Sequence, residues 1–418
     1  MLKKQISYVI IALIYLTLSA HYSYAENQEA KVLTVEEAVK IAKENNPSVG
    51  LNQAEIAISR SKVRKAKSNY YPQIKSRLIL PLIGTESGVS LDQLIWDFGK
   101  TSSIVKARKF DLDISEYDYQ DNLNDVISET KISYYRVLIA KNKVESAKKM
   151  VKKNELLLTK TKELVGSGRS SNLDLTRANS RLAESKLQMT NLENLLETSR
   201  LDLFTAMGIE PDENYKLVEN PEIEKLKYNL NESIDMAYTN SLMLKKLLAE
   251  QAGIQARLDA RKSEFFPEIF GRTAYRLKGK GSDIEGTDTP SFIAGVGIRF
   301  PIFLGFSRIA DLNETKAQYI RSQSELRQAR QQVSSEVKKT YMDMRYAINR
   351  IDVTRNNLKQ ASENLDLIKE KEKLGRASSL DLVDAESFHS QSLSNYREAV
   401  YFYKITKTKY DQLIGKLD

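Results

Sequence analysis

A short stretch around residue 296 alternates apolar residues with small or charged ones, with a period of two. Its apolar positions are Phe292, Ala294, Val296, Ile298 and Phe300. This alternation is typical of a β-strand with one apolar face. A strand of about 8–11 residues can cross a bilayer when it is tilted. A partner strand precedes it, and Arg272, Arg276 and Arg299 fall on the face opposite the apolar one. The pattern predicts a β-hairpin at about 267–303, connected by a loop at Lys278–Pro290.

A second copy of this pattern lies earlier in the chain. Ile74, Ser76, Leu78 and Leu80 oppose Gln73, Lys75 and Arg77. The chain then returns through a loop around Gly84–Gly88 into Val89–Trp96. These residues predict a second hairpin at about 72–96, which brings the chain to four strands. Trp96, at the end of that hairpin, is a candidate for the aromatic belt at a membrane interface.

Most of the remaining chain is predicted to be helical because helix breakers are missing over long stretches. Residues 100–165, 66 in number, and 306–374, 69 in number, contain no Gly or Pro, and neither do 169–207 and 376–414. Gly costs a helix about 1 kcal/mol and Pro about 3 kcal/mol. We therefore expect helices at about 100–165, 173–207, 306–374 and 380–414, with shorter ones near 34–45, 48–70, 231–240 and 242–265. At 1.5 Å per residue the longest reach roughly 100 Å, so they must lie along one another in a sheath like a coiled coil.

The two halves of the chain repeat each other. Tyr70–Ile74 reappears as Phe265–Ile269 at a shift of 195, and Asn45 matches Asn240 at the same shift. Gly168–Leu175 reappears as Gly375–Leu382 at a shift of 207, together with Ala178 and Ala385, and Gly208 and Gly415. Several landmarks at one shift indicate an internal duplication. We therefore divide the chain into repeat 1 (26–210), a linker (211–229) and repeat 2 (230–418).

The first 25 residues resemble a secretory signal peptide. Lys3 and Lys4 form its positive end, Ile6–Leu18 its apolar run, and Ser23–Ala25 a cleavage site with small residues. An uncleaved inner-membrane anchor is the alternative reading. The formal net charge of +9 becomes +7 once the two leader lysines are removed.

Composition excludes several kinds of chemistry. The chain has no cysteine and two histidines, of which His21 lies in the leader, and it contains neither GxxxxGK[ST] nor GxGxxG. Thiol catalysis, disulfides, a histidine dyad, a His-rich metal site and a phosphate-binding loop are therefore not expected. No basic stripe with interleaved aromatics indicates nucleic acid. We expect no enzyme activity and no cofactor.

The four strands raise the question of closure. Open strand edges are not viable in hydrocarbon. Two chains would give eight strands, whose interior side chains fill, whereas three chains give twelve and leave a lumen. A homotrimer follows if the hairpins are membrane strands. The alternative is an amphipathic hairpin that caps a soluble helical rod, which would make the protein a periplasmic coiled-coil adaptor or scaffold.

The chain resembles the TolC-type outer-membrane efflux proteins over nearly all of its mature length. The resemblance rests on the twofold helix–hairpin–helix order, on Leu33–Ala38 with Ala42 and Asn45–Pro47, and on an aromatic-Pro start to each hairpin. It also rests on Trp96–Lys100 at the first hairpin exit and on the Gly-x₅-Asp turns. The second exit departs from the family pattern, because Leu304 stands where an acidic residue is expected.

This resemblance implies a mainly α-helical chain with a small membrane β part. Three chains would form a 12-stranded β-barrel in the outer membrane and an α-helical barrel that extends into the periplasm. It further implies a passive export duct of a tripartite efflux or type I secretion system. The partners would be a periplasmic adaptor (membrane fusion) protein and an inner-membrane transporter. The cargo and the class of transporter are not readable from the sequence.

Two sets of residues are candidates for function. The helix–helix turns would be the adaptor-contacting tips, with Gly166, Gly168, Arg169, Ser170, Gly375, Arg376 and Ser378. Plain helix capping is the simpler reading of the same residues.

Acidic residues near these turns would line the periplasmic entrance. They are Asp174, Asp381 and Asp384, and the last two, three residues apart, share one helix face and could bind cations as a ring. The alternative is that they complement the helix dipole. Glu372 and Ala377 stand at the family's latch positions, so a closed entrance would need other contacts.

Overall fold

The structure is a computed structural model. It describes residues 31–77, 87–211, 215–220, 222–223, 228–277 and 291–417. The predicted signal peptide and most of both hairpin loops lie outside the described residues.

The elements follow the same order in both halves of the chain. The first half contains β1 (Lys31–Leu33), α2 (Val35–Asn45), α3 (Pro47–Lys67), the 3₁₀ turn η1 (Ser68–Tyr70), β2 (Gln73–Arg77), β3 (Ser87–Trp96), α4 (Lys100–Gly166) and α5 (Asn172–Met207). The second contains β4 (Tyr215–Leu217), α6 (Leu230–Asn240), α7 (Leu242–Ser263), β5 (Glu268–Leu277), β6 (Ser291–Arg299), α8 (Ser307–Lys373) and α9 (Ser379–Leu413).

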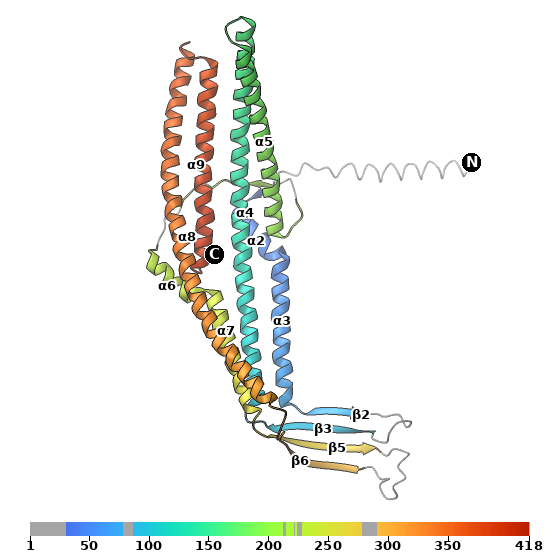
Figure 1. The fold of residues 1–418 in the computed structure, drawn as a ribbon. Coiled ribbons are helices and arrows are strands. Elements are labelled where there is room, and N and C mark those ends of the chain that lie inside the picture. The colour runs from blue at the N-terminus through green and yellow to red at the C-terminus, as the bar shows by residue number, and fades with distance from the viewer. Residues whose placement is uncertain are drawn as a thin grey trace, which may run out of the picture.

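Two long helices, α4 and α8, form the frame of the molecule. Each has 67 residues, which corresponds to roughly 100 Å. The shorter helices lie end to end beside them, α3 and α5 along α4, and α7 and α9 along α8 (Figure 1). Helix α4 also packs against α7 and α9, so it joins the two halves. The sheet lies at one end of this layer and the helix–helix turns at the other (Figure 1).

Close backbone contacts join the stacked helices. Gly208 ends α5 with a φ of +70°, and a Cβ built there would lie 2.7 Å from the carbonyl oxygen of Asn45. The side-chain amide of Asn46 caps α3 and donates to the carbonyl of Ala206 at 2.9 Å, which fixes one helix end to the other.

The second half repeats this junction. Gly415 follows α9 with a φ of +71°, and a Cβ there would lie 2.4 Å from Cβ of Asn240. Asn240 donates to the carbonyl of Ile414 at 2.9 Å. The asparagines and glycines that match between the two halves are therefore the residues at which one helix end approaches the next.

The sheet near the end of the molecule has four antiparallel strands in the order β2-β3-β5-β6. The pairing runs from β3 to β5, so the hairpins of the two halves form one sheet. Strands β2 and β6 are its edges (Figure 1).

A second, two-stranded sheet was not expected from the sequence. Strand β1 pairs in parallel with β4, which lies within the segment predicted as a linker, and Leu33 is opposite Leu217. Strands of three residues are too short to show a period of two, so the sequence pattern gives no sign of them.

One core cluster lies where this small sheet meets α4, α5 and α9. Its buried residues include Leu33, Tyr134, Leu138, Met207 and Tyr401. The hydroxyl of Tyr134 is 2.8 Å from the carbonyl oxygens of Leu33 and Val218, and it accepts from the amide of Val218 at 2.9 Å. Burial raises the pKa of Tyr134 to about 12. This one side chain ties the β1–β4 sheet to α4 through its hydroxyl.

Candidate functional site

The register separates the four-stranded sheet into an apolar and a charged face. Phe292, Ala294, Val296 and Ile298 share one face of β6, and Val296 and Ile298 are 72% and 70% exposed. Phe300 follows the end of β6 and is 51% exposed. Apolar residues this exposed on a regular strand need a covering medium or partner.

The opposite face is charged. The register places Arg272 and Arg299 on it, as the sequence pattern predicts. The side chain of Arg276, the third arginine of that prediction, lies outside the described residues. Asp92 of β3 accepts from Nε of Arg272 at 2.6 Å and lies 3.7 Å from Nζ of Lys75. A second group of charges sits where the sheet meets the helices. Oε1 of Glu268 is 3.0 Å from Nζ of Lys100, and its Oε2 is 3.4 Å from a guanidinium nitrogen of Arg299.

The first helix–helix turn connects α4 to α5 at the far end of the molecule. Gly168 has a φ of +71°, and the amide of Arg169 donates to the carbonyl of Leu164 at 2.8 Å. This is the geometry that commonly ends a helix at a glycine. Ser171 then caps α5 through a capping box with Asp174. The hydroxyl of Ser170 also donates to Asp174, at 3.0 Å.

The second turn, from α8 to α9, has the same construction. Gly375 has a φ of +66°, and the amide of Arg376 donates to the carbonyl of Lys371 at 2.8 Å. Ser378 caps α9, and both its amide and its hydroxyl donate to the carboxylate of Asp381, at 2.8 and 2.7 Å. The α4–α5 and α8–α9 turns have matching sequences and the same hydrogen bonds. Helix capping therefore determines the shape of both turns.

Hydrogen bonding lowers the pKa of the two capping carboxylates, Asp174 and Asp381. The hydroxyl of Ser171 is the main cause of the lowered pKa of Asp174, and the hydroxyl of Ser378 is the main cause for Asp381. Both side chains are at the surface, so these groups are charged at neutral pH.

Asp384 has a different partner from Asp381. Its carboxylate lies 3.0 Å from Nζ of Lys153 on α4, so it links the two helical pairs near their tips. In the first half Arg177 stands at the matching position and lies 3.8 Å from Asp174 of its own helix. The sequence places Asp381 and Asp384 on one helix face, but it does not reveal Lys153, which is more than 200 residues away in the chain. At the predicted latch positions, the carbonyl of Glu372 accepts from the amide of Gly375 at 2.9 Å, and Ala377 is half-buried.

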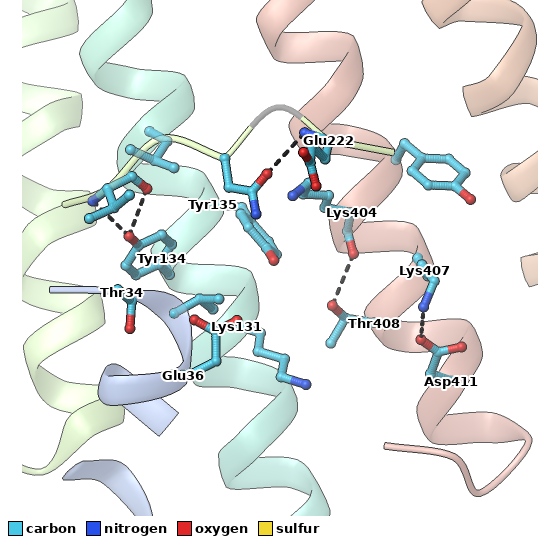
Figure 2. A pocket seen from close by; sticks show the side chains of 15 residues that line it. Thr34, Glu36, Lys131, Tyr134, Tyr135, Glu222, Lys404, Lys407, Thr408 and Asp411 are labelled. Atoms are coloured by element: carbon cyan, nitrogen blue, oxygen red, sulfur yellow. Dashed lines mark hydrogen bonds and ion pairs between the residues drawn. The ribbon is translucent and has the colours of Figure 1, made fainter. Parts of the chain in front are cut away.

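A cavity with a charged lining lies between the small sheet, α4 and α9, with a volume of about 320 Å³ (Figure 2). Its charged lining consists of Glu36, Lys131, Glu222, Lys404, Lys407 and Asp411. Three lysines face three acids, and Lys407 lies 2.6 Å from Asp411. Because these charges balance, the lining favours neither anions nor cations.

A family model described as "Outer membrane efflux protein" matches residues 38–209 and again residues 233–416. The chain belongs to this family. The two matched segments are also the two halves that contain the repeated turns.

Two curated relatives agree with the membership. Protein CyaE of Bordetella pertussis is 22% identical over 332 residues, covering 75% of this chain and 70% of that protein. The outer membrane efflux protein BepC of Brucella suis is 23% identical over 379 residues, covering 86% of this chain and 80% of that protein. The solved structure of the CmeC outer membrane channel of Campylobacter jejuni has a TM-score of 0.74 at 15% identity, and it covers 92% of this chain and 86% of that one. The fold described above is thus that of an outer-membrane channel.

This outer-membrane efflux protein is a channel subunit of a tripartite efflux or secretion system, located in the outer membrane. It is a passive duct and not an enzyme. The family forms trimers and works within tripartite systems. Among the described residues, no helix combines the length and the apolar character that a membrane-spanning helix requires.

Proposed function

We propose that three copies of this chain close their four-stranded sheets into one 12-stranded barrel in the outer membrane. The edge strands β2 and β6 of one sheet have unpaired backbone groups on their outer sides. Such groups cost several kcal/mol each in hydrocarbon, so the edges must pair with those of neighbouring copies. The apolar face with Phe292, Ala294, Val296 and Ile298 faces lipid, and the charged face lines the lumen.

Helices on both sides of the helical layer have exposed apolar side chains. Leu51 of α3 and Leu187 of α5 are 72% and 63% exposed, and Ile320, Met342 and Val353 of α8 are 63%, 66% and 61% exposed. Figure 1 shows α3 and α5 on one side of the layer and α8 on the other. A contact between two different edges closes into a ring when the rotation between copies allows it. The two exposed apolar edges are what support a helical barrel of three copies.

The helix–helix turns are the docking tips for a periplasmic adaptor. They lie at the end of the molecule farthest from the sheet (Figure 1). Arg169 and Arg376 are exposed there. Their backbone amides hold the turns, so the guanidinium groups are available for a partner. Gly166, Gly168, Ser170, Gly375 and Ser378 shape the surface that presents them.

Asp174, Asp381 and Asp384 line the periplasmic entrance. The capping bonds fix Asp174 and Asp381 at the start of α5 and α9, and the trimer repeats each carboxylate three times. Solutes would pass from an inner-membrane transporter and the adaptor through this entrance to the barrel. The two halves, residues 26–210 and 230–418, act as structural repeats joined by the segment 211–229.

The observation that carries this proposal is the sheet with one exposed apolar face and two open edges. Cross-linking tests it. Because the chain has no cysteine, the reagent can react only with the thiols that are introduced. Ile74→Cys on β2 and Val296→Cys on β6 place thiols on the apolar face of the two edge strands. A short bifunctional thiol reagent should yield covalent trimers of the double variant in outer membranes.

Control variants and a second readout separate the parts of the proposal. Each single cysteine variant should give at most dimers, and dimers alone from the double variant would contradict the closed trimer. Arg169→Glu together with Arg376→Glu should abolish co-purification of an adaptor while leaving trimers intact. Arg200→Glu, on α5 away from the turns, is the matched control; an equal loss with this control would refute docking at the tips.

A further inference from the structure

The charged face of the four-stranded sheet carries more positive than negative charge. Its described charged side chains, together with Lys100 at the start of α4, form two groups of three. One joins Lys75, Asp92 and Arg272 across β2, β3 and β5, and the other joins Lys100, Glu268 and Arg299. In each group a single carboxylate is shared between two cations, so each group has a net charge of +1. We call these six residues the cationic band.

Three of the four cations in the band are more exposed than its two carboxylates. The side chains of Lys75, Arg272 and Arg299 are 67%, 52% and 61% exposed. Those of Asp92 and Glu268 are 20% and 28% exposed. Lys100 is recessed as well, at 29% exposed. The carboxylates thus lie close to the strands, while the three other cationic groups project from them. A solute that moves along this face meets ammonium and guanidinium groups first.

Phe270 fixes the position of two of these cations. Its ring centre is 5.7 Å from the guanidinium carbon of Arg272 and 4.9 Å from that of Arg299. The ring lies over Gly297 of β6, where a Cβ would come within 2.7 Å of it. A cation held over an aromatic ring keeps a defined place at little entropic cost. The two arginines are thus arranged on the sheet surface instead of moving freely in solvent.

We infer that the cationic band makes the membrane-embedded part of the duct favour anionic solutes. This inference rests on the proposed barrel, in which the charged face lines the lumen. Two net charges per chain give six around the ring of three copies. A water-filled passage with low-dielectric walls concentrates the field of such charges and raises the local concentration of counter-ions. The acidic residues at the other end of the duct have the opposite sign, so the two ends differ in ionic preference.

Ion selectivity of the purified protein in planar bilayers tests the inference. With a gradient of KCl across the bilayer, the reversal potential gives the ratio of chloride to potassium permeability. Arg272→Gln with Arg299→Gln should lower this ratio by about threefold or more at low salt, where the screening length is about 10 Å. Arg272→Lys with Arg299→Lys keeps the charges and should retain most of the parental ratio.

The recessed carboxylates provide a test of opposite sign. Asp92→Asn with Glu268→Gln leaves all four cations in place and should raise the ratio above that of the parent. Both shifts should shrink in molar salt, where the screening length falls to about 3 Å. Arg200→Gln on α5 removes one positive charge far from the sheet and should leave the ratio unchanged.

The possible results separate this inference from the proposed barrel. A ratio that stays at the parental value in both double variants overturns the cationic band. A shift of the permeability ratio in the same direction in both double variants also overturns it. Should the arginine variant fail to fold, the carboxylate variant and the salt dependence of the parent still decide the question. A parent that inserts but forms no channels refutes the barrel, and the inference falls with it.

Discussion

Replacing Gly208 by alanine tests how the stacked helices are joined. A Cβ at this position would lie 2.7 Å from the carbonyl oxygen of Asn45 and from Cα of Asn46. Both atoms belong to the backbone, so no side-chain rotation relieves the overlap. The positive φ of Gly208 costs a residue with a Cβ about 1–2 kcal/mol, and overlap in a packed region adds about 1–3 kcal/mol. We therefore expect Gly208→Ala to lower the free energy of unfolding by about 2–5 kcal/mol.

Gly375 offers a matched control for the strain alone. Its φ of +66° is close to the +70° of Gly208, but a Cβ there would have nothing within 4 Å. Gly375→Ala should therefore cost only the backbone strain of about 1–2 kcal/mol. The difference between the two variants isolates the close approach of α5 to the junction of α2 and α3.

Thermal unfolding in detergent, followed by far-ultraviolet circular dichroism, measures this difference. Because unfolding of such proteins is often irreversible, all variants are compared at one scan rate. Gly208→Ala should unfold at a clearly lower temperature than Gly375→Ala. Gly415→Ala should behave like Gly208→Ala, since its Cβ would lie 2.4 Å from Cβ of Asn240. Equal shifts for Gly208→Ala and Gly375→Ala would refute the view that tight backbone contact holds the stacked helices together.

Three other predictions concern one tyrosine and two pairs of aspartates. Tyr134→Phe removes the hydroxyl that bonds the backbone of Leu33 and Val218 and should cost about 1–3 kcal/mol, visible as faster amide exchange at Val218. Asp381→Asn with Asp384→Asn should abolish block of conductance by di- and trivalent cations in planar bilayers; unchanged block would assign both residues to capping and ion pairing alone. The lowered pKa values of Asp174 and Asp381 stabilise the fold above the unfolded pKa near 3.8 and lose that effect as pH falls through the folded values. Thermal scans from neutral to strongly acidic pH should therefore show a smaller acid-induced loss for Asp174→Asn with Asp381→Asn, and a loss equal to that of the parent would contradict this.

Much of the fold can be predicted from the sequence because the helix breakers Gly and Pro and the period of two in the strands act over short stretches of chain. The gap without Gly or Pro from residue 100 to 165 corresponds to α4, Lys100–Gly166, within one residue. The period of two places Arg272 and Arg299 on one face of the sheet, as the register confirms. Both signals come from residues that are close in the chain, and tertiary packing does not reverse them.

Contacts between distant residues could not be predicted in this way. Lys153 and Asp384 meet only because α4 packs against α9, and no local pattern marks the pair. Strand β4 is held by pairing with β1 and by Tyr134, not by an alternating sequence of its own. The match between Gly208 and Gly415 was visible in the sequence, but its cause, the lack of space for a Cβ, needs coordinates.

The hairpin exit of the second half differs in sequence from that of the first half, yet it keeps the same shape. In the first half, the carboxylate of Asp97 accepts from the amide of Thr101 at 2.7 Å and satisfies the first turn of α4. Leu304 stands at the matching position and offers no such acceptor, yet α8 still begins at Ser307. Both exits keep two successive residues with positive φ, Phe98 and Gly99 in one and Gly305 and Phe306 in the other. The backbone turn, and not the acidic cap, is therefore what directs the chain from the sheet into each long helix.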